Sequence, residues 1–169
     1  MKKTALITGA SSGIGRELAH IHAATGGNLV LVARSTQKLN EVKIELESKY
    51  KIIAAVITKD LTAPNAAREL YDEVKSLHIE VDYLINNAGF TSRNGSLMDV
   101  DDKTFDRIFD VNVKAIYLAT QVAVPVLRKH GGGSIINVAS IGALRPRPGL
   151  VWYNGSKGAA LNMTKGMAV

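Results

Sequence analysis

The chain has 169 residues, of which 46% are hydrophobic and 5% aromatic, enough for one sizeable core but too few for two comfortable domains. It contains no cysteine, which excludes disulfides and thiolate metal sites, and no apolar run of about eighteen residues, which excludes a membrane-spanning helix. We therefore expect a single domain over residues 1–169, located in the cytoplasm and without a membrane partner.

The formal net charge is +6, and no acidic residue follows Asp110. A basic surplus can indicate a nucleic-acid partner, but these cations are scattered and lack interleaved aromatic residues. The histidines do not form a metal-binding pattern, because His20 and His22 point to different sides of a helix and His78 and His130 stand alone. We expect neither a nucleic-acid partner nor a metal site.

Apolar runs alternate with amphipathic segments along the chain. The pattern predicts strands at 3–8, 28–33, 52–58, 82–86 and 134–139. It predicts helices at 14–25, 36–49, 63–77, 99–130 in two pieces, and 153–168. Continuous valine, isoleucine and leucine runs are typical of strands covered on both faces, and right-handed crossovers then give a parallel sheet. The predicted fold class is α/β, a Rossmann-like, doubly wound parallel sheet of five strands.

A glycine-rich turn lies between the first predicted strand and the first predicted helix, at Thr8–Gly15. Glycines let the backbone turn sharply and approach a pyrophosphate, while the helix N-terminus offers free N–H groups to the anion. Without its context such a motif is more often only a turn. Here it predicts a dinucleotide site, with candidate residues Gly9, Ser11, Ser12, Gly13, Ile14 and Gly15.

The end of the second predicted strand indicates which dinucleotide is bound. Folds that prefer NAD tend to place an acid there for the adenosine 2′-hydroxyl, whereas this chain has Ala33 and Arg34. A guanidinium can pair with the 2′-phosphate of NADP, although an isolated arginine in a loop would simply be solvated. We expect NADP as the cofactor, with NAD the less favoured alternative.

Tyr153 and Lys157 are four residues apart on the last predicted helix and therefore share one face. Tyrosine is a weak base at neutral pH, but a neighbouring positive charge stabilises the phenolate and makes the hydroxyl a usable proton donor and acceptor. An exposed pair at this spacing is common. The pair gains weight from Ser140, which directly follows the apolar run 134–139 and would lie at a sheet edge.

Five motifs occur in order along the chain: T-G-x-x-x-G-I-G at 8–15, N-N-A-G at 86–89, Asn112, Ser140, and Y-x-x-x-K at 153–157. Together they resemble the short-chain dehydrogenase/reductase family of the classical type, over the whole chain. The resemblance implies hydride transfer between a nicotinamide and the carbon of a carbonyl or secondary alcohol, in a 3-oxoacyl, ketone or hydroxy compound.

The resemblance also implies roles for individual residues. Tyr153 exchanges a proton with the substrate oxygen, and Ser140 orients that oxygen through a hydrogen bond. Lys157 holds the nicotinamide ribose, and Asn112 anchors a water that leads toward it. The other cofactor contacts that the family implies are Asp60 and Leu61 beside the adenine, and Asn87, Ala88 and Gly89 after the fourth strand.

Members of this family are longer than the present chain, so we expect the last two family strands to be missing. Two functions stay open. The first is an NADP-dependent oxidoreductase acting on a small-molecule carbonyl or alcohol substrate. The second is a truncated, catalytically incompetent dinucleotide-binding domain. At full length, the resemblance implies a homodimer or homotetramer.

Overall fold

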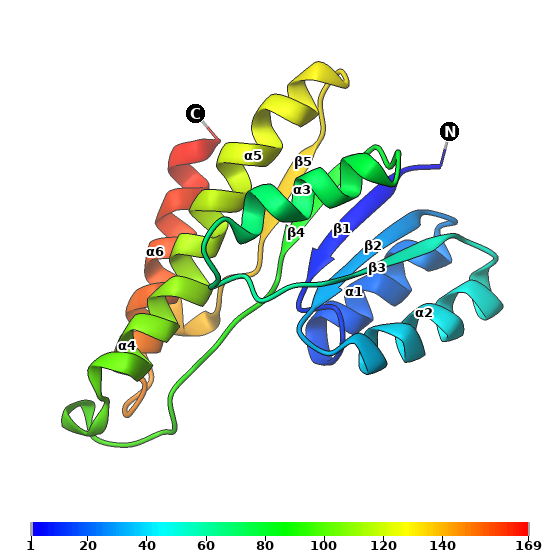
Figure 1. The fold of residues 1–169 in the computed structure, drawn as a ribbon. Coiled ribbons are helices and arrows are strands. Elements are labelled where there is room, and N and C mark those ends of the chain that lie inside the picture. Colours follow the sequence, from blue (N-terminus) through cyan, green and yellow to red (C-terminus); the bar gives the residue numbers. More distant parts are fainter. Residues whose placement is uncertain (1, 169) are drawn as a thin grey trace.

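A computed structural model describes residues 2–168. Five parallel strands form one sheet in the order β3-β2-β1-β4-β5 (Figure 1). The strands are β1 Thr4–Thr8, β2 Asn28–Ala33, β3 Ala54–Thr58, β4 Tyr83–Asn86 and β5 Ser134–Asn137. Strand order reverses beside β1, which pairs with β2 on one side and β4 on the other. In open α/β sheets, ligands bind in the crevice beyond the carboxyl ends of the strands at such a reversal.

Helices cover both faces of the sheet, as the doubly wound prediction requires. The main helices are α1 Gly13–Ala24, α2 Thr36–Tyr50, α3 Ala66–Ser76, α4 Asp102–Phe109, α5 Ala115–Lys129 and α6 Val151–Met167. Helices α1 and α2 pack on one face, and α3 and α5 pack on the other (Figure 1). Short 3₁₀ turns at η1 Leu97–Asp99 and η3 Ile141–Ala143 interrupt the loops beyond β4 and β5.

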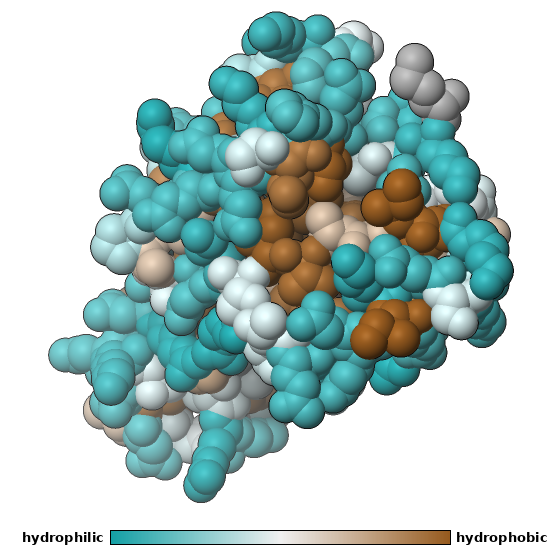
Figure 2. All heavy atoms as spheres, turned by 45° about the vertical axis from the view of Figure 1, so that its right-hand side comes forward, coloured by the Kyte–Doolittle hydropathy of each residue, from teal (hydrophilic) through white to brown (hydrophobic). Residues whose placement is uncertain are grey.

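The central strands are buried on both faces. Leu6, Ile7, Val30 and Leu31 are completely inaccessible to solvent, with successive side chains entering opposite core clusters. Burying each such side chain contributes about 1.5–3 kcal/mol to folding, so the sheet centre is a rigid platform for the loops at its carboxyl edge. Figure 2 shows a mostly hydrophilic surface with a band of apolar atoms on the side where β2, β3 and α2 lie.

Helix 99–130 was expected in two pieces, and the structure joins the pieces through a π-helical segment, η2 Asp110–Lys114. The segment carries Asn112, whose side chain is fully buried and faces the loop after β4. Single-turn π segments inside α-helices are frequent at functional sites. The predicted helix pair is therefore one continuous helical run, and its wider π-helical turn directs the Asn112 amide toward the interior.

Several predicted boundaries shift by two or three residues: α3 begins at Ala66 where 63 was expected, the helical region expected from 99 begins at Asp102, and β5 ends at Asn137 where 139 was expected. The third strand was expected to begin at Ile52, but β3 begins at Ala54, because Ile53 donates its N–H to the Asn28 side chain instead of a ladder partner. The last helix was expected to begin at Tyr153, but α6 begins at Val151, where Asn154 already donates its N–H to the carbonyl of Leu150.

Within residues 2–168, no helix is both long and apolar enough to cross a membrane.

Candidate active site

A cleft of about 450 Å³ runs along the carboxyl edge of the sheet. One end is the glycine-rich turn before α1, and the other end holds Tyr153 and Lys157 from α6. The lining includes twelve of the fourteen predicted cofactor residues, namely Gly9, Ser11, Ser12, Ile14, Arg34, Asp60, Leu61, Asn87, Ala88, Gly89, Tyr153 and Lys157. Gly13 and Gly15 are the two predicted residues that do not line it.

The glycine turn is packed directly against the loop after β4. Gly9 has a φ of +68°, a conformation that favours glycine, and a Cβ at Gly15 would overlap the Gly9 carbonyl and the Asn87 side-chain amide. The Asn87 amide donates to the carbonyls of Thr8 and Gly9, at 2.9 and 3.3 Å. Gly15 therefore supports the floor of the cleft from below, which explains why it does not line it.

Thr8, at the end of β1, is the connection between the two loops. Its Oγ1 accepts the N–H groups of Asn87 and Ala88, both at 3.0 Å, and donates to the carbonyl of Ile85 at 3.3 Å. The side chain is buried, so each of these bonds is protected from water. A single threonine thus fixes the register of the N-N-A-G turn against the glycine turn.

Charged groups gather near the ends of β2 and β3. Asp60 Oδ1 accepts the backbone N–H and the hydroxyl of Thr62, at 3.0 and 2.8 Å. These two hydrogen bonds, with the positive charges of Arg34 and Arg107 nearby, hold the pKa of Asp60 below its ordinary value. Asp60 is therefore ionised at neutral pH and can accept further hydrogen bonds.

Lys157 is buried at the other end of the cleft, with 4% of its surface exposed. Its Nζ donates to the carbonyl of Val138 at 2.7 Å, and burial lowers the pKa of the amine. Only one of the three N–H donors of the ammonium has a protein partner within the described residues. The remaining donors are available on the cleft side, where Lys157 is part of the lining.

The side-chain amide of Asn112 is hydrogen-bonded through both its oxygen and its nitrogen. Its Oδ1 accepts the N–H of Phe90 at 2.9 Å, and its Nδ2 donates to the Phe90 carbonyl and to Ser156 Oγ, at 2.8 and 2.9 Å. Asn112 Oδ1 and Lys157 Nζ each lie 3.6 Å from the point that a Cβ at Gly89 would occupy. The structure thus brings Asn112 and Lys157 together around Gly89.

Ser140 caps the short helix η3, where its Oγ accepts the N–H of Gly142 at 3.1 Å. It follows Ala139, which lines the cleft, but Ser140 itself does not line it. An oxygen that accepts one N–H still has its own hydroxyl hydrogen to donate. Ser140 is therefore placed at the rim of the cleft, with a donor that has no partner among the described residues.

The sequence profile of the short chain dehydrogenase family matches residues 3–169. This chain belongs to that family. A curated relative, dehydrogenase/reductase SDR family member 4 of Bos taurus, is 40% identical over 167 residues, which are 99% of this chain and 60% of the relative.

Solved structures of similar proteins have the same fold. L-sorbose reductase from Gluconobacter frateurii, complexed with NADPH and L-sorbose, superposes with a TM-score of 0.94 at 34% identity, covering 99% of this chain and 63% of that protein. A 3-ketoacyl-(acyl-carrier-protein) reductase from Brucella melitensis, complexed with NADH, gives a TM-score of 0.91 at 36% identity, covering 98% and 69%. This chain thus spans 60–69% of the length of these three proteins.

Several residues that build the candidate site were not predicted from the sequence. Thr8 and Ser156 support it from below, and Val138 contributes only a backbone carbonyl. Phe90, Thr91, Arg107 and Val111 also line the cleft. Phe90 directly follows the N-N-A-G motif, so that motif could have indicated it. Val138 acts through its main chain, and side-chain chemistry gave no signal for it.

Proposed function

We propose that this chain forms the cofactor site and catalytic residues of an NADP(H)-dependent oxidoreductase, which transfers a hydride between the nicotinamide and a carbonyl or secondary alcohol substrate. One observation carries the proposal: a single cleft joins a glycine turn at a helix N-terminus to a tyrosine and a buried lysine. The first feature suits a pyrophosphate, and the second suits proton exchange beside a ribose.

The residues present fit such a cofactor. The absence of a Cβ at Gly9 and Gly15 keeps the turn close to the sheet, and the same absence at Gly89 leaves space between Asn112 and Lys157. Lys157 retains ammonium donors for ribose hydroxyls, and Asp60 retains an acceptor for an exocyclic amine. The donor set therefore matches each portion of a dinucleotide in order along the cleft.

When bound, the nicotinamide supplies or accepts the hydride. In the proposed mechanism, the Tyr153 hydroxyl gives its proton to the substrate oxygen during reduction and takes it back during oxidation. The Ser140 hydroxyl donates a hydrogen bond to the same oxygen and orients it. The Lys157 ammonium stabilises negative charge that develops on the Tyr153 oxygen, and Asn112 keeps the adjoining loop in place.

The preference for NADP over NAD rests on Arg34. Its side chain is exposed at the carboxyl end of β2 and lines the cleft, and no acid stands at that position. An exposed guanidinium can form paired, charge-assisted hydrogen bonds with a 2′-phosphate. One structural relative was solved with NADPH and another with NADH, so the relatives support a nicotinamide cofactor and leave the choice to this residue.

The decisive experiment replaces Tyr153 with Phe. This change keeps the ring and removes only the hydroxyl, so we expect turnover of NADPH with a panel of ketones to fall at least about a hundredfold, while the Kd for NADPH stays within about twofold. Stopped-flow absorbance and fluorescence titration measure the two quantities. Retention of more than half the wild-type turnover would make Tyr153 a structural aromatic and refute the proposed acid.

The alternative function is a dinucleotide-binding domain without catalysis. In that case NADPH binds but no ketone is reduced. The intact mass of the natural protein helps to distinguish a binding domain from a complete enzyme. A mass near 18.1 kDa favours the binding domain, whereas a larger mass favours a complete enzyme.

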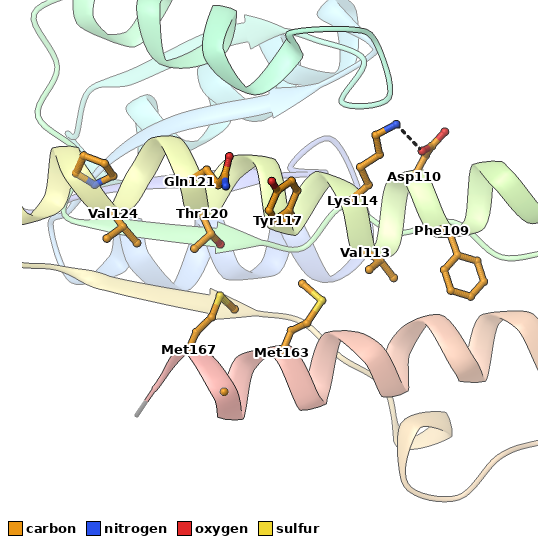
Figure 3. A pocket seen from close by; sticks show the side chains of 12 residues that line it. Phe109, Asp110, Val113, Lys114, Tyr117, Thr120, Gln121, Val124, Met163 and Met167 are labelled. Carbon is orange, nitrogen blue, oxygen red and sulfur yellow. Dashed lines mark ion pairs between the residues drawn. The ribbon is translucent and has the colours of Figure 1, made fainter.

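We also propose that the protein, at full length, is a homodimer or homotetramer. A groove of about 820 Å³ runs between α5 and α6, and its lining is almost entirely apolar. Figure 3 shows Val113 and Thr120 from one side facing Met163 and Met167 from the other. An apolar surface of this extent is typical of protein contacts, and the family resemblance implies a second copy as the partner.

A further inference from the structure

Arg107 lies on α4 and lines the cleft, although neither the motifs nor the proposed chemistry uses it. Its guanidinium carbon is 4.3 Å from the centre of the Phe90 ring, within the range of a cation–π contact. Phe90 is itself fixed, because both its backbone N–H and its carbonyl are hydrogen-bonded to the Asn112 amide. The Arg107 guanidinium is exposed, but it contacts a ring whose backbone is fixed by two hydrogen bonds.

The surroundings of Arg107 leave its donors free. No carboxylate among residues 2–168 lies within ion-pair distance of it, whereas Lys59 on the same cleft is paired with Glu69 at 3.2 Å. Val111, one helical turn later, also lines the cleft, so both side chains belong to one face of the helix. Arg107 and Asp60 both line the cleft, and the positive charge of Arg107 contributes to the lowered pKa of Asp60.

A carboxylate and a guanidinium that line one cleft offer a ligand an acceptor and a donor. The edge of adenine carries the complementary pair, because its N6 amino group donates and its N7 accepts. Asp60 Oδ1 is occupied by Thr62, but Oδ2 has no partner among the described residues. The Arg107 guanidinium lies over the Phe90 ring and has N–H groups that can donate to a ligand.

We propose that Arg107 is an adenine-recognition residue, which donates a hydrogen bond to purine N7 while Asp60 accepts one from the N6 amino group. The proposal rests on the proposed dinucleotide function and adds the group that reads the base. Arg107 thereby differs from Arg34: its contribution is common to NADPH, NADH and AMP, whereas that of Arg34 depends on the 2′-phosphate.

The test removes the proposed acceptor, purine N7, from the ligand and the proposed donor, the Arg107 guanidinium, from the protein. Calorimetric titration compares AMP with 7-deaza-AMP, in which a C–H replaces N7. We expect wild type to bind AMP about tenfold more tightly than the analogue, which corresponds to one charged hydrogen bond. Arg107→Met, which keeps an unbranched apolar side chain over Phe90, should bind both ligands equally and with the weaker affinity. Arg107→Lys retains a donor and should still prefer AMP.

Arg68→Met is the matched control, because Arg68 is an exposed cation on α3 that does not line the cleft. It should preserve the full preference for AMP. Equal binding of the two ligands by wild type would overturn the assignment without any variant, and so would an unchanged preference in Arg107→Met. If wild type binds neither AMP nor NADPH, the proposed function fails. If it binds both but ignores N7, only the role of Arg107 fails.

Discussion

The buried environment of Lys157 leaves its ammonium group with too few hydrogen-bond partners among residues 2–168. Lys157 is almost fully buried, has one hydrogen bond to the Val138 carbonyl, and has its pKa lowered by burial. A buried ammonium normally requires several partners, because leaving donors unpaired away from water costs about 1–3 kcal/mol. The missing partners are available in a ligand with two neighbouring hydroxyls. The lysine is therefore better satisfied with a bound ribose than without one.

At the same scale, Arg34 provides a test of cofactor choice. Arg34→Ala should weaken NADPH binding by about 1.5–3 kcal/mol, the value of a charged hydrogen bond, and leave NADH binding nearly unchanged. Fluorescence titration of both cofactors measures the difference. Arg107→Met is the contrasting variant, because it should weaken both. Equal losses of affinity for NADPH and NADH in Arg34→Ala would contradict the assignment of Arg34 to the 2′-phosphate.

At the scale of elements, the contact between the glycine turn and the loop after β4 decides whether the cleft exists. Gly15→Ala places a methyl group against the Gly9 carbonyl and the Asn87 amide. We expect a loss of about 2 kcal/mol or more in stability, because backbone and amide cannot both move aside. NADPH affinity should fall with it. Chemical denaturation and titration measure the two effects.

Gly155→Ala is the matched control, because a Cβ there meets nothing within 4 Å and the residue lies inside α6. Alanine in an open helical position should stabilise the protein by about 0.5–1 kcal/mol. Replacement of glycine by alanine should therefore lower stability at Gly15 and raise it at Gly155. Similar effects at both positions would mean that the close approach beneath Gly9 is absent in solution.

Asp82 joins two central elements, just before β4 begins. Its carboxylate accepts the N–H of Thr4 at 2.8 Å and the Lys3 amine at 2.6 Å. Partial burial by itself would raise the pKa of Asp82, but the hydrogen bonds from Lys3 and Thr4 outweigh it, and the net direction is downward. A carboxylate with a lowered pKa adds stability that is lost as the pH falls through its folded value.

Asp82→Asn should therefore cost about 1 kcal/mol of stability at pH 7, where the aspartate is charged in both the folded and unfolded states. The difference from wild type should shrink as the pH falls below about 4 and disappear once the folded carboxyl is protonated. Urea denaturation across this pH range measures it. A difference that stays constant with pH would show that the charge of Asp82 does not stabilise the sheet.

At the scale of the whole molecule, two apolar surfaces lie close together. The outer edge of β5 has no neighbouring strand among residues 2–168, and Ile136 on that strand is 48% exposed. The groove between α5 and α6 lies on the same side of the sheet (Figures 1 and 3). Open strand edges with apolar side chains recruit partners. We expect the 169-residue chain to self-associate in solution.

Ile136→Lys tests this expectation, because charge on an edge strand opposes pairing. Light scattering after size exclusion should show assemblies for wild type and a smaller average mass for the variant. Ile44→Lys is the control, since Ile44 is 68% exposed on α2, away from the edge, and should leave the mass unchanged. A monodisperse wild-type species of 18.1 kDa would contradict the expectation that the 169-residue chain self-associates.

Sequence patterns predicted the five strands and their parallel arrangement, and the motifs with the family resemblance predicted most of the cleft residues. Continuous apolar runs are the direct consequence of burial on both faces, so β1 and β2 are readable without coordinates. The glycine turn and the Tyr153–Lys157 spacing are also local, because each lies within one turn or one helical turn of the chain. The placement of Tyr153 and Lys157 in the cleft was therefore predictable, and their catalytic roles remain predictions.

Only the tertiary structure decided how these local pieces meet. Thr8 contacts Asn87 across 79 residues of sequence, and Asn112 contacts Ser156 across 44. The π-helical turn at Asn112, the backbone carbonyl of Val138 and the position of Arg107 over Phe90 leave no mark in composition or periodicity. The physical reason is that periodicity reports burial along one element, whereas hydrogen-bond partners and cleft walls are chosen between elements after the sheet has closed.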